Sequence, residues 1–312
     1  MAKILVSTSS FDVKNSKQLG ILEKSGFEIV LNPHGRRLTE SEVMELLHGD
    51  VVGMIAGVEP LTRKVLEASK NLKVISRCGN GLDSVDVDAA NELGILVKIT
   101  PDAPVVAAAE LTMGLILDLL RKISLADRNI RNGKWKPLMG NLLASQTVGV
   151  IGYGRIGKKV CQFLRAFGSR VIVYDKREVS LEAGLTFYSM DEVIARADVI
   201  TLHVNYEPST HHLINNARLA RMKPGALLIN PSRGGLVDEA ALFSALQSGH
   251  LGGAALDTFE EEPYKGPLIS LPQVVLTAHM GSYAKEARIQ MEQEAADNLV
   301  KGLAIQGIPV PA

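Results

Sequence analysis

The stretch that decides the fold runs from Thr147 to Asp175 and reads TVGVIGYGRIGKKVCQFLRAFGSRVIVYD. Its first five residues, through Ile151, are mostly β-branched and predict a buried strand. Glycines follow at 152, 154 and 157 in the spacing G-x-G-x-x-G, and a helical pattern continues through Leu164. A second apolar run, Val171–Tyr174, predicts the next strand. Strand, glycine turn, helix and strand in this order predict a βαβ unit with a parallel sheet.

The glycine turn has the spacing of a dinucleotide-binding site. Gly152 permits the tight turn, Gly154 lets the backbone approach a pyrophosphate, and Gly157 allows the helix to pack closely on the strand. The pyrophosphate charge is expected to lie on the N–H groups at the helix start, around Arg155 and Ile156.

The acidic residue after the second strand indicates which dinucleotide binds. Asp175 follows the glycines by about 20 residues, the spacing at which a carboxylate reaches the ribose hydroxyls. The same carboxylate would repel a 2′-phosphate, which predicts NAD rather than NADP as the cofactor. The alternative is a glycine-rich turn without a ligand, which the match of strand, helix and acidic residue disfavours.

Composition narrows the class of protein. The chain has 312 residues, which suggests two domains, and its 34 basic and 34 acidic residues cancel, so neither nucleic acid nor an anionic membrane is an expected partner. The longest apolar run, Leu111–Leu120, contains Asp118 and is shorter than the roughly 20 residues of a membrane span. Cys78 and Cys161 are far apart in the sequence, so we expect a cytoplasmic protein without disulfides or a metal site.

Apolar runs alternate with helical stretches in two series, one before residue 100 and one from Thr147 to Ala278. This alternation predicts an α/β protein with two doubly wound parallel-sheet domains. A long helical segment, Val106–Ile130, lies between the series, and another, Lys285–Leu303, is expected to return to the first domain. The predicted domains are therefore a flavodoxin-like substrate domain, 1–99 with 287–312, and a Rossmann-type cofactor domain, 100–286, inserted into it.

Three segments place polar side chains just past predicted strands: Asn230–Asp238, Leu256–Pro263 and Thr277–Ser282. Ligands of doubly wound sheets bind at the carboxyl ends of the strands. The segments bring one arginine, a run of glutamates and one histidine to that edge, which indicates a site for acid/base chemistry on an anionic ligand.

These segments resemble the D-isomer-specific 2-hydroxyacid dehydrogenase family, and the similarity covers nearly the whole chain. The motifs are GYGRIG at 152–157, SRGGLVDE at 232–239, DTFEEEP at 257–263 and AHMGS at 278–282. The resemblance is strongest to phosphoglycerate dehydrogenases without a regulatory C-terminal domain. It implies that Arg233 binds the substrate carboxylate and carbonyl, that Glu262 orients the catalytic residue His279, and that Asp257 holds the nicotinamide carboxamide. It also implies further cofactor contacts, from Pro231, Ser232, Arg233, His279, Gly281, Ser282 and His203.

The chemistry of these residue types agrees with such roles. Histidine titrates in the range that suits an acid/base, a buried carboxylate beside it favours imidazolium, and arginine binds a carboxylate bidentately. Two alternatives stay open at this point. His203 is a rival to His279 for the acid/base, and Glu260 and Glu261 compete with Glu262, which we favour because a proline follows it, as in the family's Glu-Pro pair.

A glycine-containing loop after a first-domain strand resembles the family loop whose backbone amides take the substrate carboxylate. Gly79, Asn80 and Gly81 would direct consecutive N–H groups at a carboxylate, and Arg77 precedes them. The alternative is an ordinary glycine turn before a helix.

Two stretches depart from the family pattern. Phosphoglycerate dehydrogenases usually offer an arginine to the substrate phosphate near 55–57, where this chain has Ile-Ala-Gly. The next cations are Arg63 and Lys64, and Arg77 is a candidate to replace the missing arginine. Asn205-Tyr206-Glu207 stands where many relatives have Pro-Leu-Thr, which would alter contacts near the nicotinamide.

The sequence therefore predicts an NAD-dependent enzyme that transfers a hydride between nicotinamide and C2 of a small D-2-hydroxy acid or 2-oxo acid, with 3-phosphoglycerate as one candidate. The alternatives are a hydroxypyruvate or glyoxylate reductase and, from another class, an NAD-sensing corepressor-like binding protein. The apolar segment Val106–Ile130 is expected to form a homodimer contact, or part of a tetramer.

Overall fold

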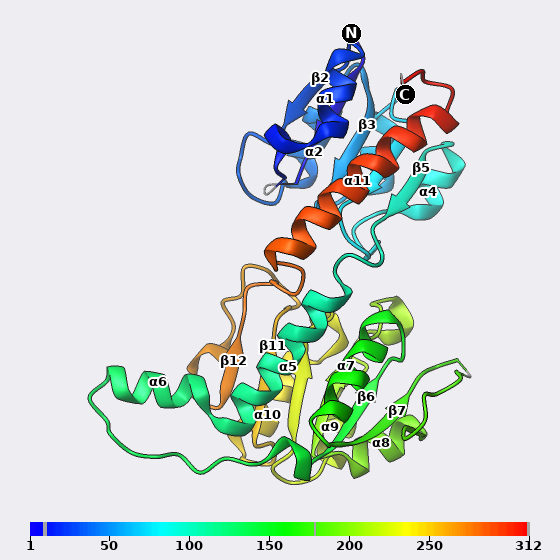
Figure 1. Ribbon diagram of the computed structural model, residues 1–312. Helices are drawn as coiled ribbons and strands as arrows, with labels where there is room; N and C mark the ends of the chain where they lie inside the picture. Colours follow the sequence, from blue (N-terminus) through cyan, green and yellow to red (C-terminus); the bar gives the residue numbers. More distant parts are fainter. Residues whose placement is uncertain (9–10, 178, 311–312) are drawn as a thin grey trace. The chain divides into compact units, whose positions relative to one another are not determined.

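The computed structural model describes residues 1–8, 11–177 and 179–310 (Figure 1). The chain forms two compact units: Met1–Pro104 with Ser282–Ala312 make up unit 1, and Val105–Gly281 make up unit 2. Residues 100–104 and 282–286, which the sequence placed in the cofactor domain, lie in unit 1. The chain leaves unit 1 only where helix α5 (Val105–Arg121) begins.

Unit 1 contains a five-stranded parallel sheet in the order β2-β1-β3-β4-β5. Its strands are β1 (Lys3–Val6), β2 (Glu28–Leu31), β3 (Val51–Ala56), β4 (Val74–Arg77) and β5 (Leu96–Ile99). Its helices are η1 (Val13–Asn15, 3-10), α1 (Lys17–Lys24), α2 (Glu40–Leu46), α3 (Arg63–Ala68), α4 (Val87–Glu92) and α11 (Lys285–Ile305).

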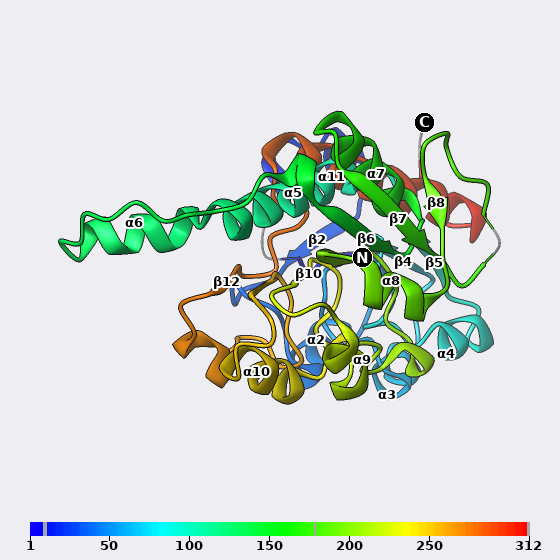
Figure 2. The same ribbon diagram turned by 90° about the horizontal axis from the view of Figure 1, so that it is seen from below.

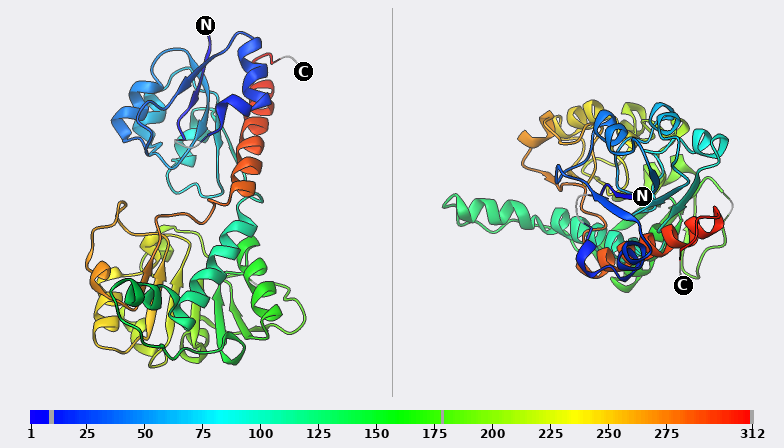
Figure 3. Two further views of the ribbon diagram at one scale, coloured as in Figure 1. Left: turned by 60° about the vertical axis from the view of Figure 1, so that its left-hand side comes forward. Right: turned by 90° about the horizontal axis from the view of Figure 1, so that it is seen from above.

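Helix α11 packs along the sheet of unit 1, beside α1 (Figure 3). The helix approaches the sheet closely because each side of the contact has a glycine. A Cβ on Gly53 of β3 would lie 2.8 Å from Leu299 Cδ1, and one on Gly302 of α11 would lie 2.6 Å from Val74 Cγ1. Leu299 and Leu303 are fully buried. The burial of these side chains fixes the returning helix on unit 1.

Unit 2 contains a seven-stranded parallel sheet in the order β12-β11-β10-β9-β6-β7-β8. Its strands are β6 (Thr147–Ile151), β7 (Arg170–Tyr174), β8 (Thr186–Phe187), β9 (Val199–Leu202), β10 (Leu227–Asn230), β11 (Gly253–Leu256) and β12 (Val274–Leu276). Besides α5, its helices are α6 (Ile123–Arg131), α7 (Arg155–Ala166), α8 (Met190–Arg196), α9 (Asn216–Arg221), α10 (Glu239–Gln247) and the 3-10 helices η2 (Leu143–Ser145), η3 (Pro208–Thr210), η4 (Gly234–Leu236) and η5 (Pro267–Ser270).

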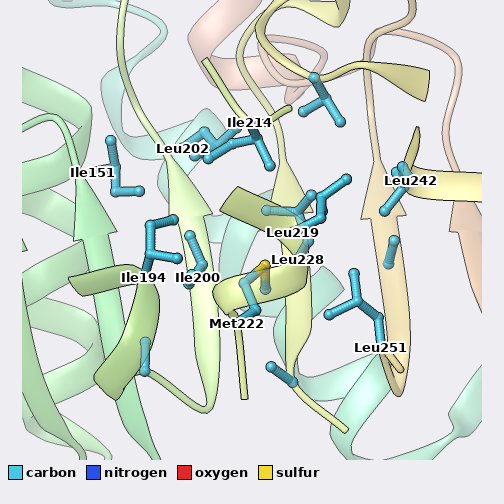
Figure 4. Close-up of a cluster of buried hydrophobic side chains, with 14 of the residues drawn as sticks. Ile151, Ile194, Ile200, Leu202, Ile214, Leu219, Met222, Leu228, Leu242 and Leu251 are labelled. Carbon is cyan, nitrogen blue, oxygen red and sulfur yellow. The ribbon is translucent and has the colours of Figure 1, made fainter. Parts of the chain in front are cut away.

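Each face of this sheet buries its own apolar cluster. Side chains of α8, α9 and α10 cover one face, where Ile194, Leu219 and Leu242 meet Ile200 and Leu228 (Figure 4). Side chains of α5 and α7 cover the other face. The predicted class, two parallel-sheet α/β domains with a Rossmann-type cofactor domain, is confirmed.

The predicted helix Val106–Ile130 is two helices. Lys122 adopts a left-handed conformation with φ 56°, and the Asp118 carboxylate accepts the Ser124 N–H at 2.7 Å, which ends α5 and starts α6. Helix α5 is buried along much of its length, whereas α6 has no buried residue and extends away from the sheet of unit 2 (Figure 2). Among the described residues, no helix combines the length and apolar character needed to cross a membrane.

Candidate active site

The register of unit 2 brings the polar segments to one edge of the sheet. Ile151 pairs with Leu202, Asn230 pairs with Leu256, and Leu256 pairs with Leu276, so the strands end side by side. The chain order reverses between β6 and β9, which creates the crevice where such sheets bind ligands.

The glycine turn after β6 leaves room for a phosphate group. Gly152 has φ 98°, and a Cβ there would lie 2.6 Å from the carbonyl carbon of His203. Gly154 caps α7 without a side-chain hydrogen bond, and a Cβ at this residue would meet nothing within 4 Å. The backbone at Gly154 therefore borders open space at the N-terminus of α7, and such a helix start fits the pyrophosphate of a dinucleotide.

Asp175 is buried beside that turn and is already held in place. Its Oδ2 accepts the Tyr153 N–H at 2.8 Å, and its Oδ1 accepts the Arg177 N–H at 3.0 Å. Burial acts to raise the pKa of Asp175, but these hydrogen bonds and the Arg177 guanidinium outweigh it, and the pKa is lowered. A carboxylate whose ionised form is favoured, at the end of β7, suits two ribose hydroxyls.

The segment Asn205-Tyr206-Glu207, which differs from the family pattern, forms an ion pair close to Asp175 in the sequence. Glu207 Oε1 lies 2.6 Å from Lys176 Nζ, so the segment after β9 is tied to the residue that follows Asp175.

His279 and Glu262 meet at the carboxyl edge of the sheet. His279 Nδ1 lies 3.0 Å from Glu262 Oε2, and Glu262 Oε1 accepts the Phe259 N–H at 3.1 Å. Both side chains are partly exposed, at 34% and 29%, so the expectation of a buried carboxylate is wrong. Because Glu262 occupies Nδ1, the Nε2 atom of His279 is the one available to a substrate.

The fully buried Asp257 shapes the loop that carries His279. Its carboxylate accepts hydrogen bonds from Thr277 Oγ1 at 2.6 Å, Met280 N at 2.9 Å and Gly281 N at 2.8 Å. Its carbonyl accepts the His279 N–H at 2.7 Å, and His279 has φ 51°, which is unusual for a residue with a side chain. Asp257 thus holds His279 in a strained conformation, a function that the sequence did not indicate.

Arg233 lies on a loop fixed by its neighbours. Asn230 Nδ2 donates to the Arg233 carbonyl at 2.8 Å, and Ser232 Oγ donates to the Leu202 carbonyl at 2.6 Å. Gly234 packs directly on the backbone of Phe259, which leaves no room for a side chain. The arginine loop, which begins at Pro231, therefore contacts the turn that carries Glu262.

The rival residues are engaged elsewhere. Burial lowers the pKa of His203 to about 3, which disfavours its protonated form, and its Nε2 is engaged with Thr201 Oγ1 at 3.0 Å. Glu260 Oε1 lies 2.7 Å from His212 Nε2 rather than beside His279. This leaves Glu262 as the glutamate at the histidine.

The glycine loop of unit 1 differs in detail from the expected nest. Gly79 has φ 144°, but its N–H donates to Thr100 Oγ1 at 2.8 Å, so a nest would consist of Asn80 and Gly81. Arg77 is buried and donates to the Cys78 carbonyl, and a Cβ on Gly79 would lie 2.7 Å from its Nη1. The Arg77 guanidinium therefore supports the loop from within unit 1.

An acidic residue stands near the position where the sequence lacks a cation. Glu59 is buried just beyond β3, where its Oε1 accepts the Gly57 N–H at 3.1 Å and the Ser7 hydroxyl. The pattern of the sequence did not single it out. No group of three or more His, Cys, Asp or Glu side chains within the described ranges is arranged to hold a metal ion.

Comparisons with known proteins identify the family. The model of the D-isomer specific 2-hydroxyacid dehydrogenase, NAD binding domain, matches residues 113–281. D-3-phosphoglycerate dehydrogenase of Methanocaldococcus jannaschii is 41% identical over 307 residues, which is 96% of this chain and 56% of the relative. Hydroxypyruvate reductase of Thermotoga maritima is 36% identical over 295 residues, 91% of this chain and 96% of the relative.

A solved structure of D-lactate dehydrogenase from Aquifex aeolicus, complexed with NAD and lactic acid, matches with a TM-score of 0.85 at 29% identity, over 98% of this chain and 96% of that one. The chain spans only about half the length of the phosphoglycerate dehydrogenases it matches. It belongs to the D-isomer specific 2-hydroxyacid dehydrogenase family, and unit 2 contains the family's NAD-binding domain.

Proposed function

We propose that this protein is an NAD-dependent dehydrogenase that interconverts a small 2-oxo acid and the corresponding D-2-hydroxy acid. The observation that carries the proposal is the pair of His279 and Glu262, 3.0 Å apart at the carboxyl edge of a dinucleotide-binding sheet. A histidine with one nitrogen held by a carboxylate and the other available is suited to moving a proton at a reacting oxygen.

Proton transfer and substrate binding are assigned to different residues. In reduction, His279 Nε2 donates a proton to the carbonyl oxygen, while Glu262 stabilises the imidazolium. In oxidation, the same nitrogen accepts the hydroxyl proton. Arg233 binds the substrate carboxylate and polarises the carbonyl. In unit 1, the Asn80 and Gly81 N–H groups are the candidates for binding an anionic group of the substrate. NAD, when bound, supplies the hydride chemistry.

The surroundings of β3 favour an unphosphorylated substrate. The buried Glu59 carboxylate stands near the position where a phosphate would need a cation, and Arg77 is occupied with its own loop. Hydroxypyruvate or glyoxylate therefore fits the site better than 3-phosphoglycerate, which stays a candidate.

The test is NADH oxidation with a panel of 2-oxo acids that differ in their distal group, together with NAD reduction by 3-phosphoglycerate. We expect turnover with hydroxypyruvate or glyoxylate and little with the phosphorylated acid. Tight NADH binding without turnover on any acid would favour a cofactor-sensing binding protein instead.

Cofactor preference follows from Asp175. We expect the protein to bind NADH more tightly than NADPH because the Asp175 carboxylate would meet the 2′-phosphate. Asp175→Ala should weaken NADH binding by about 10- to 100-fold, since hydrogen bonds to a charged group contribute about 1.5–3 kcal/mol. The same variant should reduce the difference in affinity between NADH and NADPH, because the repelling carboxylate is gone and the Arg177 guanidinium remains nearby.

Calorimetric titration of both cofactors checks this expectation, with Asp50→Ala, a change at an exposed residue of unit 1, as the control. Equal or tighter NADPH binding by the unchanged protein would contradict it.

We also propose a cytoplasmic homodimer, or a tetramer built from it, with α6 and the segment after it as the contact. The apolar residues of α5 are largely buried within unit 2, but Trp135 and Met139 are 89% and 87% exposed. A second copy of the chain is the expected partner because large exposed apolar side chains on a projecting segment match a two-fold interface.

Trp135→Asp with Met139→Asp should convert the dimer to a monomer in analytical ultracentrifugation. Ile269→Asp, at a side chain that is 60% exposed elsewhere in unit 2, is the matched control and should leave the dimer intact. A stable monomer for the unchanged protein would overturn the assembly.

A further inference from the structure

The turn after β11 carries Glu262 and has little support of its own. Phe259–Glu262 form a surface segment in which the Phe259 ring stacks on Tyr264, at 4.4 Å between ring centroids, and Glu262 Oε1 accepts the Phe259 N–H at 3.1 Å. Glu262 must nevertheless stay within hydrogen-bond distance of His279. Other groups that fix this turn would therefore affect the proton relay.

One such group comes from the start of α10. Glu239 Oε1 accepts the backbone N–H of Glu260 at 2.8 Å. Glu239 is partly buried, and desolvation raises its pKa, while the Glu260 N–H opposes that rise. This carboxylate holds the backbone of the turn two residues before Glu262.

A second group comes from the segment after η3. His212 Nε2 lies 2.7 Å from Glu260 Oε1, so the same residue is held through its side chain as well. His212 is itself anchored, since its N–H donates to the Gly235 carbonyl at 2.8 Å and its ring stacks on His211 at 3.9 Å. Its left-handed conformation, φ 48°, directs the chain into this position.

Both groups that hold Glu260 are connected to the segment that carries Arg233. Gly235, which anchors His212, and Glu239 follow Arg233 in the same segment, and Gly234 packs on Phe259. The Glu262 turn is therefore fixed at Glu260 to the segment that presents Arg233. Such a connection keeps the carboxylate of Glu262 and the guanidinium of Arg233 in register with each other.

We propose that Glu239 and His212 are positioning residues for the proton relay, which they support by holding Glu260 so that Glu262 remains at His279. The inference rests on the proposed function, because it assigns these residues to the same reaction. Neither side chain is proposed to contact the substrate or the cofactor.

The test uses the full chain with the best 2-oxo acid found. Glu239→Ala and His212→Asn, where asparagine tolerates the left-handed backbone, should each lower kcat about tenfold, as expected for the loss of one hydrogen bond to a charged group. In both variants the alkaline limb of the reductive pH profile should move to lower pH, as in Glu262→Gln, while the NADH dissociation constant stays within about twofold. Glu239→Gln keeps an acceptor oxygen and should rescue most of the activity, and Glu261→Gln is the control for a neighbouring charge.

A double-mutant cycle separates positioning from general stability. If Glu239 acts through Glu262, Glu239→Ala combined with Glu262→Gln should be no slower than Glu262→Gln alone. Unchanged kcat and pH profile in Glu239→Ala and His212→Asn, with Glu262→Gln impaired, would overturn the inference and leave the proposed function intact. An unchanged protein that turns over no 2-oxo acid would instead overturn the proposed function. NADH binding reports folding, and if Glu239→Ala fails that check, His212→Asn decides alone.

Discussion

His279→Ala is expected to lower kcat for reduction of a 2-oxo acid by about 10²–10⁴-fold, or about 3–5 kcal/mol of barrier. The imidazole is the proposed proton donor, and within the described part of unit 2 the His203, His212 and His250 rings have other hydrogen-bond partners. His203, the earlier rival, has its pKa lowered to about 3 by burial. NADH binding should stay near normal because it rests on the glycine turn and Asp175.

Glu262→Gln separates the charge of Glu262 from its hydrogen bond to His279. The amide keeps the shape but removes the negative charge that favours a protonated imidazole. Reduction needs the protonated form, whose share falls as pH rises, so the alkaline limb of the kcat profile should move to lower pH. Oxidation needs the neutral form and should extend to lower pH.

Steady-state kinetics across pH, with NADH affinity measured separately, tests both variants. Wild-type kcat in His279→Ala would place the acid elsewhere. A Glu262→Gln profile that matches the unchanged protein would show that the hydrogen bond at 3.0 Å has no electrostatic part in catalysis.

The elements that the sequence predicted well are those whose signals are local. The glycine turn, Asp175 and the three strand-end segments each lie within short stretches, and parallel pairing then brings the segments to one edge without further information. The choice of Glu262 over Glu260 and Glu261 followed from the next residue, a proline that matches the family's Glu-Pro pair, and the structure pairs Glu262 with His279.

The features that the sequence did not predict depend on distant partners. The Gly79 N–H is taken by Thr100, and the carboxylate of Asp257 is filled by the loop at 277–281. The break in Val106–Ile130 occurs at a lysine, a residue that favours helix, because Asp118 captures the start of the next helix. Apolar spacing continues across the break, so periodicity could not reveal it.

Arg233→Ala is expected to lower kcat/KM by about 10³-fold, since it removes up to two charge-assisted hydrogen bonds of about 1.5–3 kcal/mol each. Unlike His279→Ala, it should also raise KM for the 2-oxo acid. The loop should stay in place because Asn230 holds the Arg233 backbone at 2.8 Å and the side chain is not needed for that contact.

Arg233→Lys keeps the charge and loses the planar fork, so it distinguishes charge from geometry. If the guanidinium binds the carboxylate bidentately, lysine should recover only a small part of kcat/KM. If a single positive charge suffices, lysine should recover most of it. NADH titration separates any change in cofactor binding, to which the family resemblance also assigns Arg233, from the change in substrate binding.

The separate effects of Arg233→Ala on KM and on kcat show whether Arg233 acts in the ground state, in the transition state or in both. A guanidinium that binds only the carboxylate contributes equally in the ground state and the transition state, so its loss raises KM and leaves kcat unchanged. A guanidinium that also polarises the carbonyl acts more strongly as negative charge develops on that oxygen, so its loss lowers kcat as well. We expect both changes, because Arg233 lies on a loop that packs against the Glu262 turn through Gly234 and is thus fixed relative to the proton donor. An aldehyde substrate without a carboxylate isolates the second effect: Arg233→Ala should still reduce its kcat, and an unchanged value would restrict the residue to binding the carboxylate.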